Sequence, residues 1–202
     1  MASIPARGPR YRRLKPDDRR EMLIAAGLAC LKHGGLLAFT IDRITEEANV
    51  SRGLITHHFG SKDGLLVAVY RKMYNQLLDS VLATEATTDL DSMVDAVLSE
   101  DLFEPGALRA WLALWGEIGG NAELIKVHRE YYARYRASVA RVIDIAARSR
   151  SRHVDAEALA VTLIALVDGL WLERSLDPGG LSGSDARAAC TAFLTARLGP
   201  DG

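Results

Sequence analysis

The sequence predicts an all-α protein built from two units. Almost every segment of the 202 residues repeats its apolar residues at helical spacing, and no stretch alternates apolar and polar residues between hairpin signals. The hydrophobic content of 49% is enough to bury a core. We therefore expect a small N-terminal unit of three helices, a polar stretch near residues 84–91, and a larger C-terminal helical bundle.

The first predicted helix begins at Pro16. Asp17 and Asp18 follow it, and acidic residues in a first turn interact favourably with the helix dipole. Apolar residues recur at helical spacing until Gly34-Gly35, where we expect the helix to stop; they include Ile24, Leu28 and Leu31.

Two short helices are expected next, in close succession. Thr40 can cap one that runs to about Asn49, and Ser51 can cap another that runs to about Phe59, with only Val50 between them. Helices this short and this close must cross. Their apolar residues can form a three-helix core with the first helix; these are Ile41, Ile44, Ala48, Val50, Leu54, Ile55 and Phe59.

The remaining helices are longer. Ser61, followed by Lys62 and Asp63, starts one that reaches about Ala83, and Gly179-Gly180 separates the last two. A central helix of the bundle is expected at 121–149, because one seam repeats every three or four residues through Ile125, His128, Tyr132, Tyr135, Val139, Val142 and Ala146. The other helices are expected at about 91–102, 106–118, 155–175 and 184–198.

Charge is divided unevenly along the chain. Residues 1–72 carry 13 Lys+Arg and 7 Asp+Glu, whereas the remainder carries 12 and 19. A basic first part favours contact with a polyanion, although chance clustering on a solvated surface gives the same pattern. A basic N-terminal arm, residues 1–16, can reach into a minor groove or remain a solvated tail; its cations are Arg7, Arg10, Arg12, Arg13 and Lys15.

Several classes of protein find no support in the sequence. It contains no G-x-S-x-G, phosphate loop or H-E-x-x-H, so we expect no enzyme, no catalytic residue, no metal site and no cofactor. Cys30 and Cys190 lack the spacing of a zinc site or disulfide framework and are interpreted as buried free thiols. No run of 18 or more apolar residues and no signal-type stretch occurs, which favours a cytoplasmic protein without a membrane partner.

Residues 40–62 have the pattern of a helix-turn-helix unit. Such a unit places its second helix in the major groove of DNA, where backbone amides favour phosphate contact. The start and exposed face of that helix carry Ser51, Arg52, Gly53, Thr56, His57 and His58, and Gly53 permits close approach of the backbone. Pairs of capped helices also occur in ordinary bundles, so the spacing by itself leaves both interpretations open.

At these residues the sequence resembles the TetR family of transcriptional regulators. The shared pattern is Thr40, then Val50-Ser51-Arg52-Gly53, then His57-His58-Phe59, then Ser61-Lys62-Asp63-Gly64-Leu65. The resemblance implies phosphate contacts from Thr40, Ser51, His58 and Lys62. It places Arg43, Arg52, Gly53, Thr56 and His57 closest to base edges or adjoining phosphates. Position 57 is commonly tyrosine in the family, and histidine shortens the reach and makes a contact there sensitive to pH.

The C-terminal part is similar to the betaine-regulator (BetI-like) branch of that family. The similarity lies in LRAWLALWGE (108–117), ARYRASV (133–139) and LIALVDGLWLERSL (163–176). It implies a repressor that a small-molecule effector releases from its operator, with choline or a related quaternary amine as a candidate.

Large aromatic residues and one acidic residue could hold such a cation. They are Trp111, Trp115, Tyr132, Trp171 and Asp168. The same rings at helical spacing could instead be ordinary core packing, and a neighbouring arginine or a helix end could balance Asp168. His128 lies on the apolar seam, where a lone histidine is usually just hydrogen-bonded.

The expected assembly is a homodimer on palindromic double-stranded DNA, because one short recognition helix supplies too few contacts for specificity. Helices 155–175 and 184–198 are the expected interface, with Leu159, Leu163, Leu166 and Phe193 buried there. The predicted domains are the arm 1–16, a DNA-binding unit 17–62, and an effector-binding and dimerisation unit 63–202. The competing hypothesis is a helical module whose basic face binds a protein or membrane.

Overall fold

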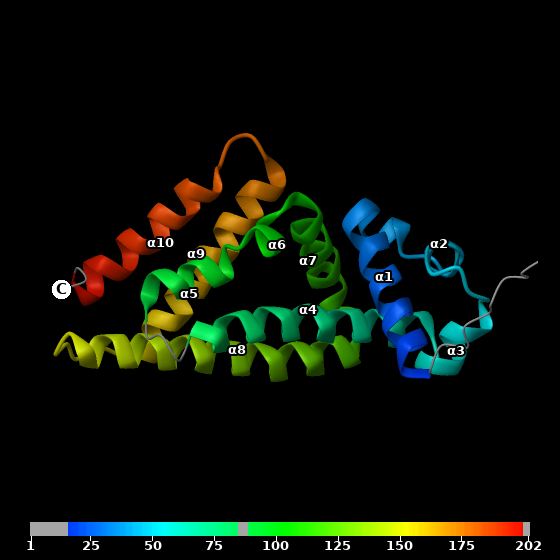
Figure 1. Cartoon of the computed structure of the whole chain (residues 1–202), viewed down its shortest axis with the longest axis horizontal. Helices are drawn as coiled ribbons and strands as arrows, with labels where there is room; N and C mark the ends of the chain where they lie inside the picture. The colour runs from blue at the N-terminus through cyan, green and yellow to red at the C-terminus, as the bar shows by residue number, and fades with distance from the viewer. Residues whose placement is uncertain (1–15, 85–88, 200–202) are drawn as a thin grey trace, which may run out of the picture.

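The computed structural model describes residues 16–84 and 89–199, and within these ranges every regular element is a helix (Figure 1). The predicted basic arm lies outside the described residues, apart from Pro16. The predicted fold class is confirmed: a small helical unit at one end is followed by a larger bundle. The helices are α1 (Pro16–Ala38), α2 (Ile41–Glu47), α3 (Gly53–Phe59), α4 (Lys62–Thr84), α5 (Leu90–Val97), α6 (Glu100–Phe103), α7 (Pro105–Ile118), α8 (Ala122–Ser149), α9 (Ala156–Leu176) and α10 (Gly183–Leu198).

The first three helices share one apolar core, as their spacing predicts. Thr40 caps α2, because its hydroxyl accepts a hydrogen bond from the backbone N–H of Arg43 at 3.3 Å. The start of α4 joins this core, and the space beside Gly27 of α1 is filled by Phe39 and Val69. Fully buried side chains of the unit include Leu23, Leu31, Phe39, Ile44, Ile55 and Leu65.

The turn between α2 and α3 is longer than the sequence pattern predicts. Ser51 does not cap α3: the helix begins at Gly53, Arg52 occupies the N-cap without a side-chain hydrogen bond, and the Ser51 carbonyl accepts from Leu54 N–H at 3.1 Å. Residues 48–52 separate the two helices, in place of Val50 alone. Asn49 explains the difference, since its φ of 50° is a left-handed turn conformation that asparagine tolerates well.

The glycine pair in α1 breaks the helix where the sequence predicts. Gly34 and Gly35 have non-helical backbone angles, and Gly35 has φ 60° and ψ −152°, a region open essentially to glycine alone. One further helical turn follows to Ala38, so the element resumes after the break instead of stopping there.

The C-terminal bundle is organised around α4 and α8, which lie side by side and run in the same direction (Figure 1). Two contacts mark this register: Arg71 forms an ion pair with Glu123, and further along both helices the ring of Tyr74 contacts that of Tyr131. α9 returns along α8, and α10 packs on α5 and α9. The predicted seam of α8 is half-buried at His128 and Tyr132, and its later members, from Tyr135 onward, are buried.

The helix predicted at 91–102 is in fact two helices. α5 is capped by Asp89, whose carboxylate accepts from the N–H groups of Asp91 and Ser92, and it ends at Val97. Leu98 leaves the helical conformation and α6 begins at Glu100. The other predicted helices of the bundle are confirmed within a few residues.

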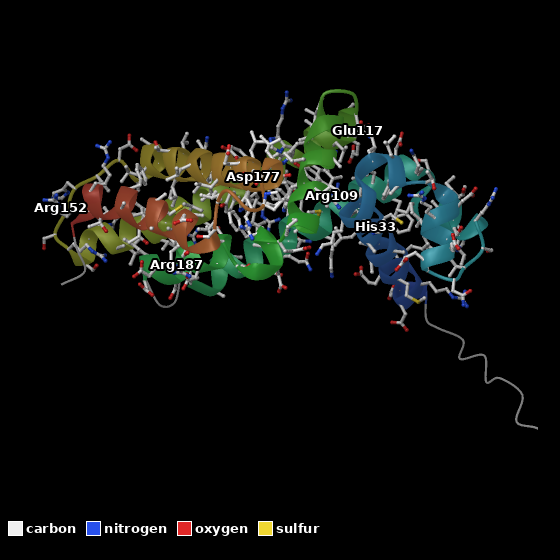
Figure 2. All side chains as sticks on the ribbon, turned by 90° about the horizontal axis from the view of Figure 1, so that it is seen from above. His33, Arg109, Glu117, Arg152, Asp177 and Arg187 are labelled. Atoms are coloured by element: carbon white, nitrogen blue, oxygen red, sulfur yellow. The ribbon has the colours of Figure 1, made fainter. Side chains whose placement is uncertain are left out.

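α7 connects the two units in space. It packs against α1 on one side and against α8 and α9 on the other. Figure 2 shows Arg109 of α7 beside His33 of α1. The orientation of the N-terminal unit therefore depends on α7 as well as on the continuous helix α4.

α1 is rich in apolar residues, although charged residues divide them into shorter stretches. Residues 17–38 of α1 are long and apolar enough, by length and composition alone, to cross a membrane. In this fold Leu23, Ile24 and Leu31 of that helix are buried in the core of the N-terminal unit. Packing within the protein thus accounts for these three residues, whereas Leu37 near the end of the helix is exposed. Cys30 and Cys190 are free and buried, as predicted.

Candidate functional site

The side chains predicted to contact DNA lie on the outer surface of α2, α3 and the first turn of α4. All of them are exposed except His58, which is half-buried. Lys62 is the first residue of α4, whose N-terminus adds unpaired backbone N–H groups to its positive charge. The surface comprises Thr40, Arg43, Ser51, Arg52, Gly53, Thr56, His57, His58 and Lys62.

Short-range packing fixes the direction in which α3 meets α4. Gly60 ends α3 with φ 74°, and the Ser61 hydroxyl accepts from Gly64 N–H at 3.0 Å to start α4. A Cβ on Gly64 would lie 2.1 Å from the carbonyl oxygen of Phe59, so only glycine fits there. The glycine in the S-K-D-G-L motif is therefore required by the close approach of two helix ends.

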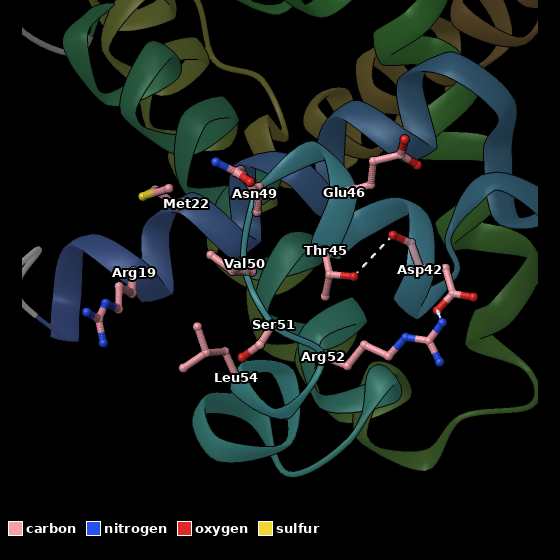
Figure 3. A pocket seen from close by; sticks show the side chains of 11 residues that line it. Arg19, Met22, Asp42, Thr45, Glu46, Asn49, Val50, Ser51, Arg52 and Leu54 are labelled. Carbon is pink, nitrogen blue, oxygen red and sulfur yellow. Dashed lines mark hydrogen bonds and ion pairs between the residues drawn. The ribbon is translucent and has the colours of Figure 1, made fainter. Parts of the chain in front are cut away.

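A groove of about 1040 Å³ lies between α1, α2 and the turn before α3 (Figure 3). At its edge the Arg52 guanidinium forms an ion pair with Asp42 at 2.8 Å, which joins the two helices of the pair. Both groups are exposed, so the pair stabilises the fold little. Its effect is to hold the guanidinium against the first turn of α2. The Thr45 hydroxyl donates to the carbonyls of Ile41 and Asp42 at 2.9 and 3.1 Å and stays within its own helix.

A second cavity, of about 340 Å³, lies inside the C-terminal bundle. Side chains from α4, α7, α8 and α9 line it, and all five residues predicted to bind a ligand are among them. The full lining is Tyr74, Leu77, Trp111, Trp115, Ile118, His128, Tyr132, Tyr135, Ile164, Asp168 and Trp171.

The aromatic rings are core residues and cavity walls at the same time. Trp111 and Trp171 are almost fully buried and stack with 5.9 Å between ring centroids, and Trp115 lies 6.4 Å from Trp171. Tyr74 packs edge-on against Trp111 at 5.0 Å. The two interpretations of these rings, packing or pocket, therefore do not exclude each other.

Two ionisable groups of the cavity wall, Asp168 and His128, have unusual surroundings. Burial raises the pKa of Asp168 to about 6. Burial also lowers the pKa of His128, whose Nδ1 lies 2.9 Å from the Tyr70 hydroxyl and 3.3 Å from that of Tyr74. The hydrogen-bonded role expected for His128 is thus observed, although the side chain also reaches the cavity.

Two donors in this region lack acceptors. The indole N–H groups of Trp111 and Trp171 are buried and have no hydrogen-bond partner among the described residues. A buried donor without a partner costs about 1–3 kcal/mol, so an acceptor from a bound molecule would stabilise either of them. No group of three metal-ligating side chains occurs within residues 16–84 and 89–199.

Sequence reasoning missed two residues of the cavity lining with clear chemical character. Tyr135 belongs to the large aromatic residues of the C-terminal unit but is not among the predicted ligand residues, and the sequence gives no signal at all for Tyr74. Tyr74 reaches the cavity only because α4 lies parallel to α8, and no local pattern in the sequence indicates that pairing.

The predicted dimer face requires a correction. Leu163 is 2% exposed and packs inward within its own chain, so it belongs to the core of one protomer. Leu159, Leu166 and Phe193 are half-buried. The outward face of α9 carries apolar side chains at helical spacing instead: Val161, Ala165, Leu172 and Leu176.

Both parts of the chain match described protein families. Residues 23–69 match the family described as bacterial regulatory proteins of the tetR family. Residues 86–199 match the family described as BetI-type transcriptional repressor, C-terminal.

Curated relatives match over nearly their whole length. The chain is 33% identical over 187 residues to the HTH-type transcriptional regulator BetI 2 of Chromohalobacter salexigens, covering 87% of this chain and 86% of the relative. It is 31% identical over 191 residues to the regulator BetI of Serratia proteamaculans, covering 89% and 92%.

Solved structures show the same fold. A transcriptional regulator from Pseudomonas aeruginosa PAO1 superposes with a TM-score of 0.80 at 34% identity, covering 93% of each chain. A regulator from Saccharomonospora viridis, solved in complex with choline, superposes with a TM-score of 0.77 at 23% identity, covering 90% of this chain and 98% of its own.

Proposed function

Because this chain belongs to the TetR family of bacterial transcriptional regulators and has a BetI-type C-terminal domain, we propose that choline or a related quaternary amine releases it from its operator. The observation that carries this proposal is the cavity in the bundle, where three tryptophans and the half-buried carboxyl of Asp168 come together. The proposed regulator acts as a homodimeric repressor in the cytoplasm.

The chemistry of the cavity suits a quaternary ammonium ion. Its ammonium group has no N–H and cannot donate a hydrogen bond, so aromatic faces and a carboxylate are the favourable partners of that group. Each aromatic face contributes about 0.5–2 kcal/mol. The unpartnered indole N–H groups of Trp111 and Trp171 would suit the oxygen of choline or betaine aldehyde. A relative of the same fold was solved in complex with choline.

The surface around α3 is the proposed DNA-reading part. Exposed Lys62, Ser51, Thr40 and half-buried His58 are proposed to contact phosphates, which position a protein without reading sequence. Arg43, Arg52, Gly53, Thr56 and His57 are proposed to lie nearest the base edges of the major groove.

Dimerisation is proposed to use the outward faces of α9 and α10. Val161 and Leu172 are large apolar side chains exposed on α9 in the isolated chain, and α10 lies beside that helix. Two protomers related by a two-fold axis would present two copies of α3 to a palindromic site.

A binding experiment tests this function directly. Duplex sequences selected from a random pool by the purified protein define the operator, and choline chloride is then titrated into the protein–operator complex with sodium chloride at equal ionic strength as the control. We expect choline to release the operator and to change tryptophan emission over the same concentration range. Release without any emission change would place the effector outside the cavity, and no selected duplex would refute sequence-specific DNA binding.

A further inference from the structure

α7 presents two opposite faces to two different partners. Trp111 and Trp115 point to the cavity in the bundle, whereas Arg109 and Ala113 face α1. Two residues of separation correspond to about 200° around a helix, so these pairs lie on opposite sides. α7 therefore connects the wall of the cavity directly to the surface that contacts the DNA-binding unit.

Arg109 holds the end of the first part of α1. Its Nη1 donates to the carbonyl oxygens of Lys32 at 2.8 Å and His33 at 2.9 Å, directly before the break at Gly34 and Gly35. Carbonyls at a helix end lack N–H partners and favour a cation beside them. The break faces α7 directly, since a Cβ on Gly35 would be in ordinary van der Waals contact, at 4.0 Å, with both Arg109 Cγ and Ala113 Cβ.

A second polar contact joins the same turn of α1 to the start of α7. Lys32 Nζ forms an ion pair with Glu104 at 3.0 Å, and the Glu104 carboxylate caps α7 by accepting from Gly106 N–H and Ala107 N–H. Burial disfavours the charged form of this carboxyl and would raise its pKa. The hydrogen bonds from Lys32 and the two amides outweigh that effect, so the pKa of Glu104 is lowered. The N-terminus of α7 is thereby anchored to α1.

The other long connection between the two units is α4, which runs from the core of the N-terminal unit to the cavity at Tyr74. α4 packs against α1 and α3, so α4 and the contact of α7 with α1 are two separate attachments of the N-terminal unit to the bundle. We propose that Arg109 is the positioning residue that makes the orientation of the DNA-binding unit depend on whether the cavity is filled. This inference rests on the proposed function, because it assigns the route by which the cavity acts on DNA binding.

The replacement Arg109→Met keeps an unbranched, flexible stem and removes the guanidinium donors. Coupling is measured as the ratio of choline dissociation constants for operator-bound and free protein, which is reciprocal with the effect of choline on operator affinity. For the wild-type protein we expect this ratio of dissociation constants to be about ten or more. We expect a ratio near one for Arg109→Met. For Arg109→Lys, which retains a donor, we expect an intermediate ratio. Arg136→Met is the matched control, because Arg136 pairs with Glu157 between α8 and α9 and is remote from α1.

An unchanged ratio in Arg109→Met, with helicity intact, would overturn the proposal. A second measurement needs no effector: the three tryptophans of the chain all line the cavity, so operator binding alone should shift their emission in the wild-type protein and not in Arg109→Met. If choline binds neither form, the proposed effector is wrong and this emission shift still decides the role of Arg109. Its absence in the wild-type protein, or its survival in Arg109→Met, refutes the coupling.

Discussion

Asp168 gives the cavity a charge that depends on pH. Its carboxyl lies among aromatic rings, and burial raises its pKa to about 6. Burial also lowers the pKa of His128 and raises those of Tyr74 and Tyr135, so these cavity residues stay uncharged near pH 7. Among the lining residues, Asp168 is therefore the side chain that can attract a cation above pH 6 and lose that attraction below it.

Choline binding should consequently weaken on acidification. Protonation of Asp168 removes the anion, so the affinity measured by calorimetry should be constant above pH 7 and fall by about tenfold in total as the pH drops through 6. The variant Asp168→Asn should bind about tenfold more weakly at pH 7.5, or about 1.4 kcal/mol, and lose the pH dependence. The same slope in the variant would assign the titration to another group.

Lys62 and Arg52 should affect DNA binding differently. A phosphate contact carries no base information, so Lys62→Ala should weaken binding to every duplex and lower the salt slope by about 0.9. Arg52→Ala should chiefly reduce the preference for the operator over random-sequence DNA. For a bidentate base contact, the difference between the two binding free energies should shrink by about 1–3 kcal/mol. Fluorescence anisotropy at several salt concentrations separates the two effects, and equal losses on both duplexes for Arg52→Ala would remove it from base reading.

The residues of the cavity are partly predictable from the sequence. Cation chemistry and a family resemblance point to Trp111, Trp115, Tyr132, Asp168 and Trp171. Neither points to Tyr74, because its position depends on the parallel pairing of α4 with α8. A residue's chemistry can be judged from its own type, whereas its neighbours follow from packing between distant segments.

At the scale of elements, backbone geometry explains where the predicted boundaries are right. Thr40 and Ser61 are caps in the structure as in the prediction. Ser51 is not, because Asn49 takes a left-handed conformation and extends the turn. Helical spacing shows which residues of α9 share a face, but it cannot show which face turns inward, and this is why the prediction for Leu163 is wrong.

The two faces of α9 should respond differently to the same charge. Leu163→Asp places an anion in the protomer core and should lower the free energy of unfolding by more than about 3 kcal/mol. Leu172→Asp, at a position 44% exposed in the single chain, should leave helicity intact and produce monomers with weak operator affinity. Circular dichroism and sedimentation measure both outcomes. A stable dimer of Leu172→Asp would place the interface elsewhere.

The break in α1 should depend on Gly35. Its backbone angles lie in a region that side chains other than glycine occupy only under strain, so Gly35→Ala should cost about 1–3 kcal/mol of unfolding free energy. Gly53 is the control, because it is helical and a Cβ there meets nothing within 4 Å. Gly53→Ala should be neutral or stabilise by up to about 1 kcal/mol. Urea denaturation compares the two, and equal stability of both variants would contradict the strain argument.

At the scale of the whole molecule, the basic charge of the first third lies mostly outside the helix-turn-helix unit. Residues 16–72 carry 8 Lys+Arg and 7 Asp+Glu, so the excess comes from the arm. The described DNA-binding unit is therefore nearly balanced in charge, and its predicted contacts depend on where single cations lie.

Deleting residues 2–15 should test the contribution of the arm. The slope of log affinity against log salt falls by about 0.9 for each phosphate that the protein no longer neutralises, so the five cations of the arm can change it by several units. The protected region around the two copies of α3 should keep its centre in a footprint. An unchanged salt slope would mean that the arm is a solvated tail.

The continuous helix α4 gives the molecule mechanical leverage. Its 23 residues span about 35 Å, so a tilt of about 5° pivoting at the bundle end moves the other end by about 3 Å. Opposite tilts in two protomers would change the separation of their recognition helices by about 6 Å, against a DNA repeat of about 34 Å. Tyr74 lies about 15 Å from that pivot, so a displacement of its ring would be magnified about twofold at the groove.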